Sequence, residues 1–173
     1  MTIIEKSPQD SFTQMTELVL PNDTNTLGNL MGGRLMHWMD IVSAIAAGRH
    51  SNQTVVTAAV DYVEFRSPIR LGELVILKAQ VTRAFTSSME VKIDALAENW
   101  LTAETRVANS AYYTFVAVDK NGKPLPVNTL APQTDREKKL HESAMRRREL
   151  RLILAGRMKP EEATLLKKIF LTD

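Results

Sequence analysis

The chain has 173 residues, 44% of them hydrophobic, and a formal net charge of +2. This length fits one domain with a short appendage, and it can bury a core without disulfides or metal. The absence of cysteine excludes a disulfide framework, a cysteine-liganded zinc and a cysteine nucleophile. The sequence shows no signal peptide and no apolar segment near the ~18 residues of a membrane span, so we expect a cytoplasmic protein.

The charge is unevenly distributed along the chain. Residues 135–173 contain 11 Lys and Arg against 7 Asp and Glu, whereas residues 1–134 contain 11 against 13. A basic tail can bind an anionic partner, but the mixed charges favour a solvated helix with salt bridges. Arg146, Arg147, Arg148 and Arg151 have no interleaved aromatic residues, so we expect no nucleic-acid partner.

The first predicted elements are a strand, a loop and a long helix. Residues 14–20 alternate partly in hydrophobicity and end at Pro21, which indicates a strand. Residues 22–29 are polar and form a loop. Residues 30–49 have apolar side chains at helical spacing, and their neighbours are mostly apolar too. We therefore expect a helix that is buried on most of its sides.

Four strands follow, with a period of two. They span residues 54–66, 73–84, 87–98 and 106–119, and Pro- and Gly-containing breaks separate several of them. The clearest alternation places one set of side chains on one face and another set on the opposite face: Met89, Val91, Ile93 and Ala95 against Ser88, Glu90, Lys92 and Asp94. The sequence predicts an α+β fold in which the long helix covers one face of an antiparallel sheet.

A charged tail follows the Pro-rich segment 123–132. Residues 135–155 are predicted to form a helix that ends near Gly156, and Pro160 begins a second helix over residues 160–170. We therefore divide the chain into a domain over residues 1–130 and a charged helical extension over residues 131–173.

Gly32 and Gly33 stand directly before the long helix. A helix N-terminus has unpaired N–H groups and a partial positive charge, which together can bind an oxyanion or a phosphate. The alternative is that the two glycines only allow the loop to turn into the helix. The G-x-G-x-x-G pattern of a dinucleotide site is absent.

Asp40 lies among apolar residues in this predicted helix. A buried carboxylate is costly unless it is paired or acts in a polar cleft, so Asp40 is either a structural residue with a partner or a functional one. His37, one turn earlier, could pair with it for acid–base chemistry. The other histidines, His50 and His141, show no metal-ligand spacing with His37, so we expect no metal site.

The loop before the helix supplies further polar side chains. Asn25 can donate and accept hydrogen bonds at once, which suits the orientation of a water molecule. Asn, Asp and Thr are also the usual residues of turns and helix caps, and Asn22, Asp23 and Thr24 fit that alternative.

The segment PNDTNTLGNLMGGRLMHWMD, residues 21–40, resembles the signature of the hotdog-fold acyl-CoA thioesterases of the YciA and brain acyl-CoA hydrolase type. In that family a Pro-x-Asp-x-Asn-x-x-Gly-x-x-x-Gly-Gly segment leads into a helix that carries an acidic residue. The similarity continues in VVTAAVDYVEFRSPIRLGELV, TSSMEV and AYYTFVAVDKNGKPLPV. It covers about residues 12–127 and does not include the tail.

The resemblance implies a hotdog fold, in which an antiparallel sheet wraps a long central helix. It implies hydrolysis of acyl-CoA to a free acid and CoA, a reaction of lipid metabolism, at sites between paired subunits, with a trimer of dimers (a hexamer) as the larger assembly. Asp40 takes the place of the family's acid, as general base or as nucleophile. Asn25 takes the place of the residue that orients the water or the carbonyl. Gly33, with Gly32 beside it, supplies the backbone N–H at the start of the helix.

The same resemblance implies no cofactor, because CoA is part of the substrate. Candidates for binding it lie near the family motifs: Arg66, Arg70, Arg83, Ser87 and Ser88. Two other functions stay open. One is a non-catalytic acyl-CoA sensor that uses the basic tail for interactions. The other is a thioester dehydratase, which normally needs a His beside the acid, and the loop over residues 22–29 contains no His.

Overall fold

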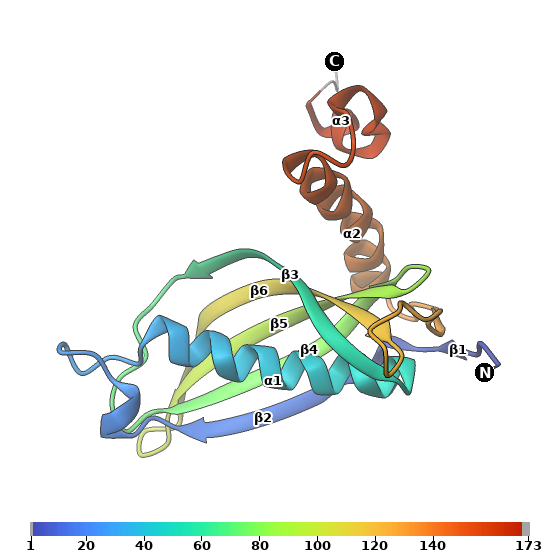
Figure 1. Ribbon diagram of the computed structural model, residues 1–173. Coiled ribbons are helices and arrows are strands. Elements are labelled where there is room, and N and C mark those ends of the chain that lie inside the picture. The colour runs from blue at the N-terminus through green and yellow to red at the C-terminus, as the bar shows by residue number, and fades with distance from the viewer. Residues whose placement is uncertain (1, 171–173) are drawn as a thin grey trace. The chain divides into compact units, whose positions relative to one another are not determined.

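The long helix α1 (Gly32–Ser51) lies across one face of a five-stranded sheet in the computed structural model, which describes residues 2–170 (Figure 1). The strands are β2 (Thr13–Leu18), β3 (Thr54–Phe65), β4 (Leu74–Ala84), β5 (Ser88–Asn99) and β6 (Glu104–Val118). Their order is β2-β4-β5-β6-β3 and each neighbouring pair is antiparallel. The predicted α+β class and hotdog fold are confirmed.

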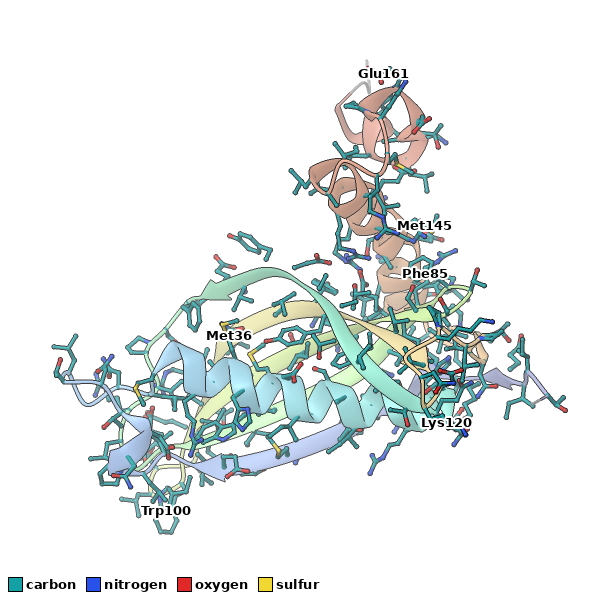
Figure 2. All side chains as sticks on the ribbon, viewed as in Figure 1. Met36, Phe85, Trp100, Lys120, Met145 and Glu161 are labelled. Carbon is teal, nitrogen blue, oxygen red and sulfur yellow. The ribbon has the colours of Figure 1, made fainter. Side chains whose placement is uncertain are left out.

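The core lies between α1 and the sheet. The side chains of Met89, Val91, Ile93 and Ala95 on β5 are all completely buried, as their alternation predicts. On α1 the buried side chains recur at helical spacing, with Leu35, Trp38, Met39, Val42, Ala46 and Ala47 against the sheet. Side chains fill the space between the two layers (Figure 2). A helix with one apolar stripe and a sheet with one apolar face therefore cover each other.

One face of α1 is not covered within the single chain. Ile41 and Ile45 are 38% and 42% exposed. The edge strand β3 is similar, because Val56 and Val60 are 47% and 41% exposed. The prediction that α1 is buried on most of its sides is confirmed, because most of its residues outside this face are buried or half-buried.

Two short strands close the domain. β1 (Glu5–Lys6) pairs in parallel with β7 (Thr129–Leu130), and the alternation of the sequence did not predict either. Nζ of Lys6 donates to the carbonyl of Arg49 at 2.7 Å and to Oδ1 of Asn52 at 2.6 Å. Asn52 ends α1 in the left-handed conformation, with φ of 56°.

Contacts divide the chain into two compact units, Met1–Ala131 and Pro132–Asp173. The second contains α2 (Asp135–Leu154), a 3₁₀ turn (Pro160–Glu162) and α3 (Thr164–Phe170). Thr134 begins α2 with a capping box, in which its Oγ1 accepts from the N–H of Glu137 at 3.2 Å. Glu149 is buried and accepts the N–H groups of Leu165 and Leu166. Both helices of the predicted tail are confirmed, the second beginning at Thr164 rather than at residue 160.

None of the helices in the described residues is long and apolar enough to cross a membrane.

Candidate active site

The first turn of α1 leaves its N–H groups open. The first helical hydrogen bond runs from the N–H of Leu35 to the carbonyl of Met31 at 3.0 Å, and the N-cap residue Met31 provides no side-chain cap. Within the described residues, the N–H groups of Gly32 and Gly33 therefore have no acceptor. Gly33 is exposed, and a Cβ atom built on it would meet nothing within 4 Å. This terminus can stabilise negative charge on an approaching oxygen.

Gly32 is needed for a close approach. A Cβ atom at this position would lie 3.1 Å from Cζ of Phe65, whose ring covers the start of the helix from the end of β3. Any side chain here would press on the ring. The glycine pair thus does more than allow a turn, because Gly32 allows the close approach of the Phe65 ring and Gly33 leaves the helix start open.

An ion pair between a buried aspartate and an exposed arginine holds the loop against the same helix turn. Asp23 is 4% exposed, and its Oδ1 accepts from Nε of Arg34 at 2.7 Å while its Oδ2 accepts the N–H of Leu20 at 3.1 Å. The carbonyl of Asp23 accepts the N–H of Met31. Arg34 also stacks over Trp38, 5.5 Å from the ring centre. Sequence reasoning treated Asp23 only as a possible capping residue and did not predict this pair.

Asn25 organises the loop through its side-chain oxygen. Its Oδ1 accepts the N–H groups of Leu27 at 2.9 Å and Asn29 at 3.2 Å, and its backbone N–H donates to the carbonyl of Asn29 at 2.8 Å. Gly28 completes the turn with φ of 72°. The amide Nδ2 of Asn25 donates no hydrogen bond to the described chain, so it is the group that can contact a ligand.

Asn25 lines a cavity of about 290 Å³ together with Leu35, Phe65, Arg66 and Ala108. The walls are mostly apolar and the rim is polar, which suits an amphipathic ligand. Asp40 does not line this cavity. The single chain therefore brings Asn25 and the start of α1 to one place and leaves the carboxylate out of it.

Asp40 is half-buried on α1 and has one hydrogen-bond partner among residues 2–170. Its Oδ1 accepts a hydrogen bond from Oγ1 of Thr57 on β3 at 2.6 Å. His37 is exposed and makes no hydrogen bond with Asp40 among the described residues, so the His–Asp pair considered from the sequence does not form. Sequence reasoning missed Thr57, because only the packing of β3 on α1 brings the two residues together.

Tyr113 of β6 lies beneath the same turn of α1. Its hydroxyl donates to the carbonyl of Met36 at 3.4 Å, and Met36 is labelled on α1 in Figure 2. Burial, with a smaller effect from the charge of Asp40, raises the pKa of Tyr113 to about 12. The phenol is therefore neutral at ordinary pH.

The five candidate CoA-binding residues lie at two ends of the sheet. Arg66 and Arg70 flank the segment that follows β3, and Nε of Arg66 donates to Oε2 of Glu64 at 2.7 Å. Arg83, Ser87 and Ser88 lie around the β4–β5 turn, at the Phe85 end of the body in Figure 2, opposite Trp100. Burial lowers the pKa of Arg83, opposed by the charge of Glu90. Strands of this length span about 35 Å, so the two groups cannot meet one phosphate within one chain.

A metal centre finds no support in the described part of the chain, where no group of three acidic or histidine side chains could hold an ion. His50 is completely buried, and its Nε2 lies 2.9 Å from the carbonyl of Asn128. This histidine joins the end of α1 to the segment before β7 and takes no part in the candidate site.

Comparison with known proteins gives consistent results. Residues 27–104 match the model of the thioesterase superfamily. The chain is 41% identical over 139 residues to the uncharacterized acyl-CoA thioester hydrolase YkhA of Bacillus subtilis, covering 80% of this chain and 81% of that one. It is 36% identical over 136 residues to the cytosolic acyl coenzyme A thioester hydrolase of Rattus norvegicus, which covers 76% of this chain and only 35% of the rat protein.

Solved structures agree with the fold. A hexameric acyl-CoA thioesterase crystallised without ligand superposes with a TM-score of 0.86 at 40% identity, covering 88% of this chain and 98% of that one. An acyl-CoA hydrolase from Staphylococcus aureus, in complex with butyryl-CoA, CoA and CoA disulfide, has a TM-score of 0.81 at 36% identity and covers 88% and 94%. Structures of that enzyme with one aspartate, one threonine or one asparagine changed to alanine are similar as well.

Proposed function

Because this chain belongs to the acyl-CoA thioester hydrolases of the thioesterase superfamily, we propose that it hydrolyses acyl-CoA to a free carboxylic acid and CoA at sites shared between two copies. The observation that carries this proposal is the carboxylate of Asp40, which lies between apolar residues on α1 and is held by Thr57, on a helix whose N–H terminus is open. A carboxylate base and a positive helix terminus are the two groups that acyl transfer to water needs.

The variants of the Staphylococcus aureus enzyme support the choice of residues. Its replaced asparagine and aspartate are 15 residues apart, and the aspartate and threonine are 17 apart. Asn25, Asp40 and Thr57 have the same two spacings here. Agreement in three residue types and in both separations supports the correspondence of these residues, because the intervening segment includes a loop, a helix and the start of a strand.

The chemistry follows from the positions of these groups. The substrate carbonyl oxygen accepts the N–H of Gly33, with Gly32 leaving space beside it. Asp40 removes a proton from water as the water oxygen bonds to the carbonyl carbon, and Nδ2 of Asn25 orients the water or the carbonyl. When the C–S bond breaks, the CoA sulfur takes the proton from Asp40. In the alternative route an oxygen of Asp40 attacks the carbonyl carbon, the C–S bond breaks, and the CoA thiolate leaves and takes a proton from solvent. Water then hydrolyses the anhydride to the free acid and the Asp40 carboxylate. Neither route uses a cofactor, since CoA enters as part of the substrate.

A second copy explains the uncovered surfaces of the chain. Ile41 and Ile45 on α1 and Val60 on the edge strand β3 are exposed apolar side chains, and Val60 pairs with Tyr113 on the sheet face that α1 covers. In the pair that we propose, burial of these residues brings Asp40 of one chain next to the Asn25 cavity of the other. The minimal unit is then a dimer with two sites. The hexameric relative supports a trimer of such dimers.

The CoA-binding residues, the cellular location and the roles of the two parts of the chain complete the proposal. Arg66 and Arg70 from one end of the sheet, and Arg83, Ser87 and Ser88 from the other, are proposed to meet the CoA phosphates from different chains. A cytoplasmic location is supported by the rat relative, which is named as cytosolic. Residues 1–130 form the thioesterase domain and residues 131–173 an extension that packs subunits together.

Release of CoA thiol from a panel of acyl-CoAs of increasing chain length tests the proposal. Hydrolysis requires thiol release that depends on enzyme concentration and stops in an Asp40→Asn variant. An acyl-CoA sensor would bind the same compounds without releasing thiol. A dehydratase would interconvert hydroxyacyl- and enoyl-CoA and leave the thioester intact. Either of these results would contradict the proposed reaction.

A further inference from the structure

Asn109 on β6 is a buried side chain whose polar atoms have no partner. It is completely buried, and neither Oδ1 nor Nδ2 has a hydrogen-bond partner among the described residues. Buried amides are nearly always bonded, and an unbonded one costs folding stability that an apolar residue of the same size would not. The position of Asn109 suggests a function that accounts for this loss of folding stability.

The register of the sheet places Asn109 on the face covered by α1. It lies opposite Ala95 of β5 and opposite Phe65 of β3. Ala111 and Tyr113 follow on the same face, because the pairing between β5 and β6 is regular from Asn109 onward. Its neighbours on this face include two alanines, which do not fill the space around the amide as larger side chains would.

The same register joins Asn109 to the candidate site. Phe65 is its partner on β3, and directly opposed side chains lie about 5 Å apart. The ring of Phe65 covers Gly32 at the start of α1, and Phe65 and Ala108 both line the Asn25 cavity. Asn109 thus lies directly behind one wall of that cavity. Phe65 is 56% exposed, so the ring that separates them is packed on one side only.

A bulge fixes this arrangement. The register between β5 and β6 shifts at Ala95, where Ala108 is the extra residue on β6. The carbonyl of Ala108 accepts the N–H groups of Arg66 at 3.0 Å and Ser67 at 3.4 Å, which ties the end of β3 to the bulge. Bulges commonly redirect side chains beside active sites. Here the bulge places Ala108 in the lining of the cavity and Asn109 next to it in the chain, behind that lining.

We propose that Asn109 determines the acyl specificity of this site, by forming its polar inner end and hydrogen-bonding a hydroxyl group on a short acyl chain. This rests on the proposed hydrolysis and names its substrate class, short hydroxyacyl-CoAs. The carbonyl carbon lies at the start of α1, and the chain extends past Gly32 and displaces the ring of Phe65 to reach Asn109. A hydroxyl satisfies both halves of the amide, because it accepts from Nδ2 and donates to Oδ1, whereas a keto oxygen can only accept.

The test compares substrates of equal chain length. For the full-length enzyme, kcat/KM is measured with butyryl-, 3-oxobutyryl-, 3-hydroxybutyryl- and 4-hydroxybutyryl-CoA. We expect one hydroxybutyryl compound to exceed butyryl-CoA by at least about 10-fold, with the oxo compound between them, since only the hydroxyl pairs both groups of the buried amide. Asn109→Leu should reduce that ratio to one or below, because the leucine side chain offers neither a donor nor an acceptor to the hydroxyl.

Thr114 provides a matched control. It lies on the same strand but on the opposite face, is 5% exposed, and its Oγ1 also has no partner among the described residues. Thr114→Val removes a buried hydroxyl that does not line the cavity. The ratio of its kcat/KM for hydroxybutyryl-CoA to its kcat/KM for butyryl-CoA should therefore equal that of the wild type. If Asn109→Leu fails to fold, Asn109→Ser, which shortens the side chain, should lower the ratio instead.

The outcomes separate the two proposals. A wild-type ratio near one, or a ratio that Asn109→Leu and Asn109→Ser leave unchanged, would overturn the role of Asn109 while hydrolysis of butyryl-CoA upholds the enzyme's reaction. Absence of thiol release from every acyl-CoA would instead overturn the reaction itself.

Discussion

Oγ1 of Thr57 donates a hydrogen bond to Oδ1 of Asp40 at 2.6 Å and links the edge strand to the helix that carries the carboxylate. The bond occupies one oxygen of Asp40 and leaves Oδ2 without a partner in the described chain. It therefore fixes the orientation of the carboxylate while leaving one oxygen for chemistry. The first prediction tests the chemical role of the carboxylate, and the second tests the orienting role of the hydrogen bond.

Asp40→Asn should leave the fold intact and lower kcat by at least about 100-fold, because the amide keeps the shape and can still accept from Thr57 but cannot act as base or nucleophile. Circular dichroism and thiol release on the same preparation check both parts. A rate within a few-fold of the wild type would mean that Asp40 is a structural residue.

Thr57→Val should lower kcat by about 10-fold, since it removes one hydrogen bond to a charged group and keeps the side-chain volume. Thr57→Ser restores the hydroxyl and should recover most of the rate, which distinguishes loss of the bond from loss of packing. Equal rates for the Val and Ser variants would contradict an orienting role.

Sites shared between chains can be tested with a mixed dimer. Asn25→Asp keeps the oxygen that accepts from Leu27 and Asn29 but loses the Nδ2 donor, so the loop should persist while activity falls. Combined with an Asp40→Asn chain, it yields one site with both changes and one without either. The heterodimer, purified through two different tags, should regain about half the wild-type rate if the sites act independently. A folded mixed dimer as inactive as its parents would place Asn25 and Asp40 in a same-chain site.

The tail offers a separate prediction. A chain ending at Ala131 lacks the second unit, and we expect it to form smaller assemblies whose dimers still release thiol. Gel filtration with light scattering gives the size, and the thiol assay gives the rate per site. An inactive dimer would show that residues 132–173 contribute to catalysis.

His50 should make stability depend on pH. Burial lowers its pKa below the usual value near 6.5, against the opposing effect of its bond to Asn128. The unfolded chain therefore binds a proton before the folded chain does. The stability that neutral His50 contributes is complete above about pH 6.5 and is lost as the pH falls toward the folded pKa, at up to about 1.4 kcal/mol per unit.

Urea unfolding at pH 7.5 and 5.5 measures this effect against a His50→Gln variant. Nε2 of Gln can replace Nε2 of His50 as the donor to the carbonyl of Asn128, but Gln does not titrate. The variant should lose less stability over this interval than the wild type. The same loss in both proteins would assign the pH dependence to other groups.

Periodicity predicted most of the fold because it reports local geometry. The alternation of Met89, Val91 and Ile93 identified the buried face of β5, and the 3.6-residue spacing placed α1 within two residues of its ends. The two-residue strands β1 and β7 are too short for a period. They form where Asn128 joins distant segments, since its Oδ1 accepts the N–H of Ile4 and its Nδ2 donates to the carbonyl of His50.

Sequence patterns predicted less of the candidate site than of the fold. Asp40 stood out because a carboxylate among apolar neighbours is rare. Thr57 and Asn109 are ordinary polar residues in strands, and only the register reveals what they face. The ion pair between Asp23 and Arg34 joins positions 11 residues apart across a loop, which no pattern predicts. The roles of Asn25, Gly33 and the CoA-binding residues stay predictions until the variants are measured.

The parallel pairing of β1 with β7 has a consequence for how this domain can be built into longer polypeptides. The chain enters the domain at Glu5 and leaves it after Leu130 along the same edge, with Glu5 paired to Thr129. Such a module can be inserted into, or joined head to tail with, other segments without a long connector, because its two attachment points already adjoin. A circular permutant that links residue 131 to residue 4 through a few glycines, and opens instead at the exposed turn around Gly122, should fold to the same sheet order.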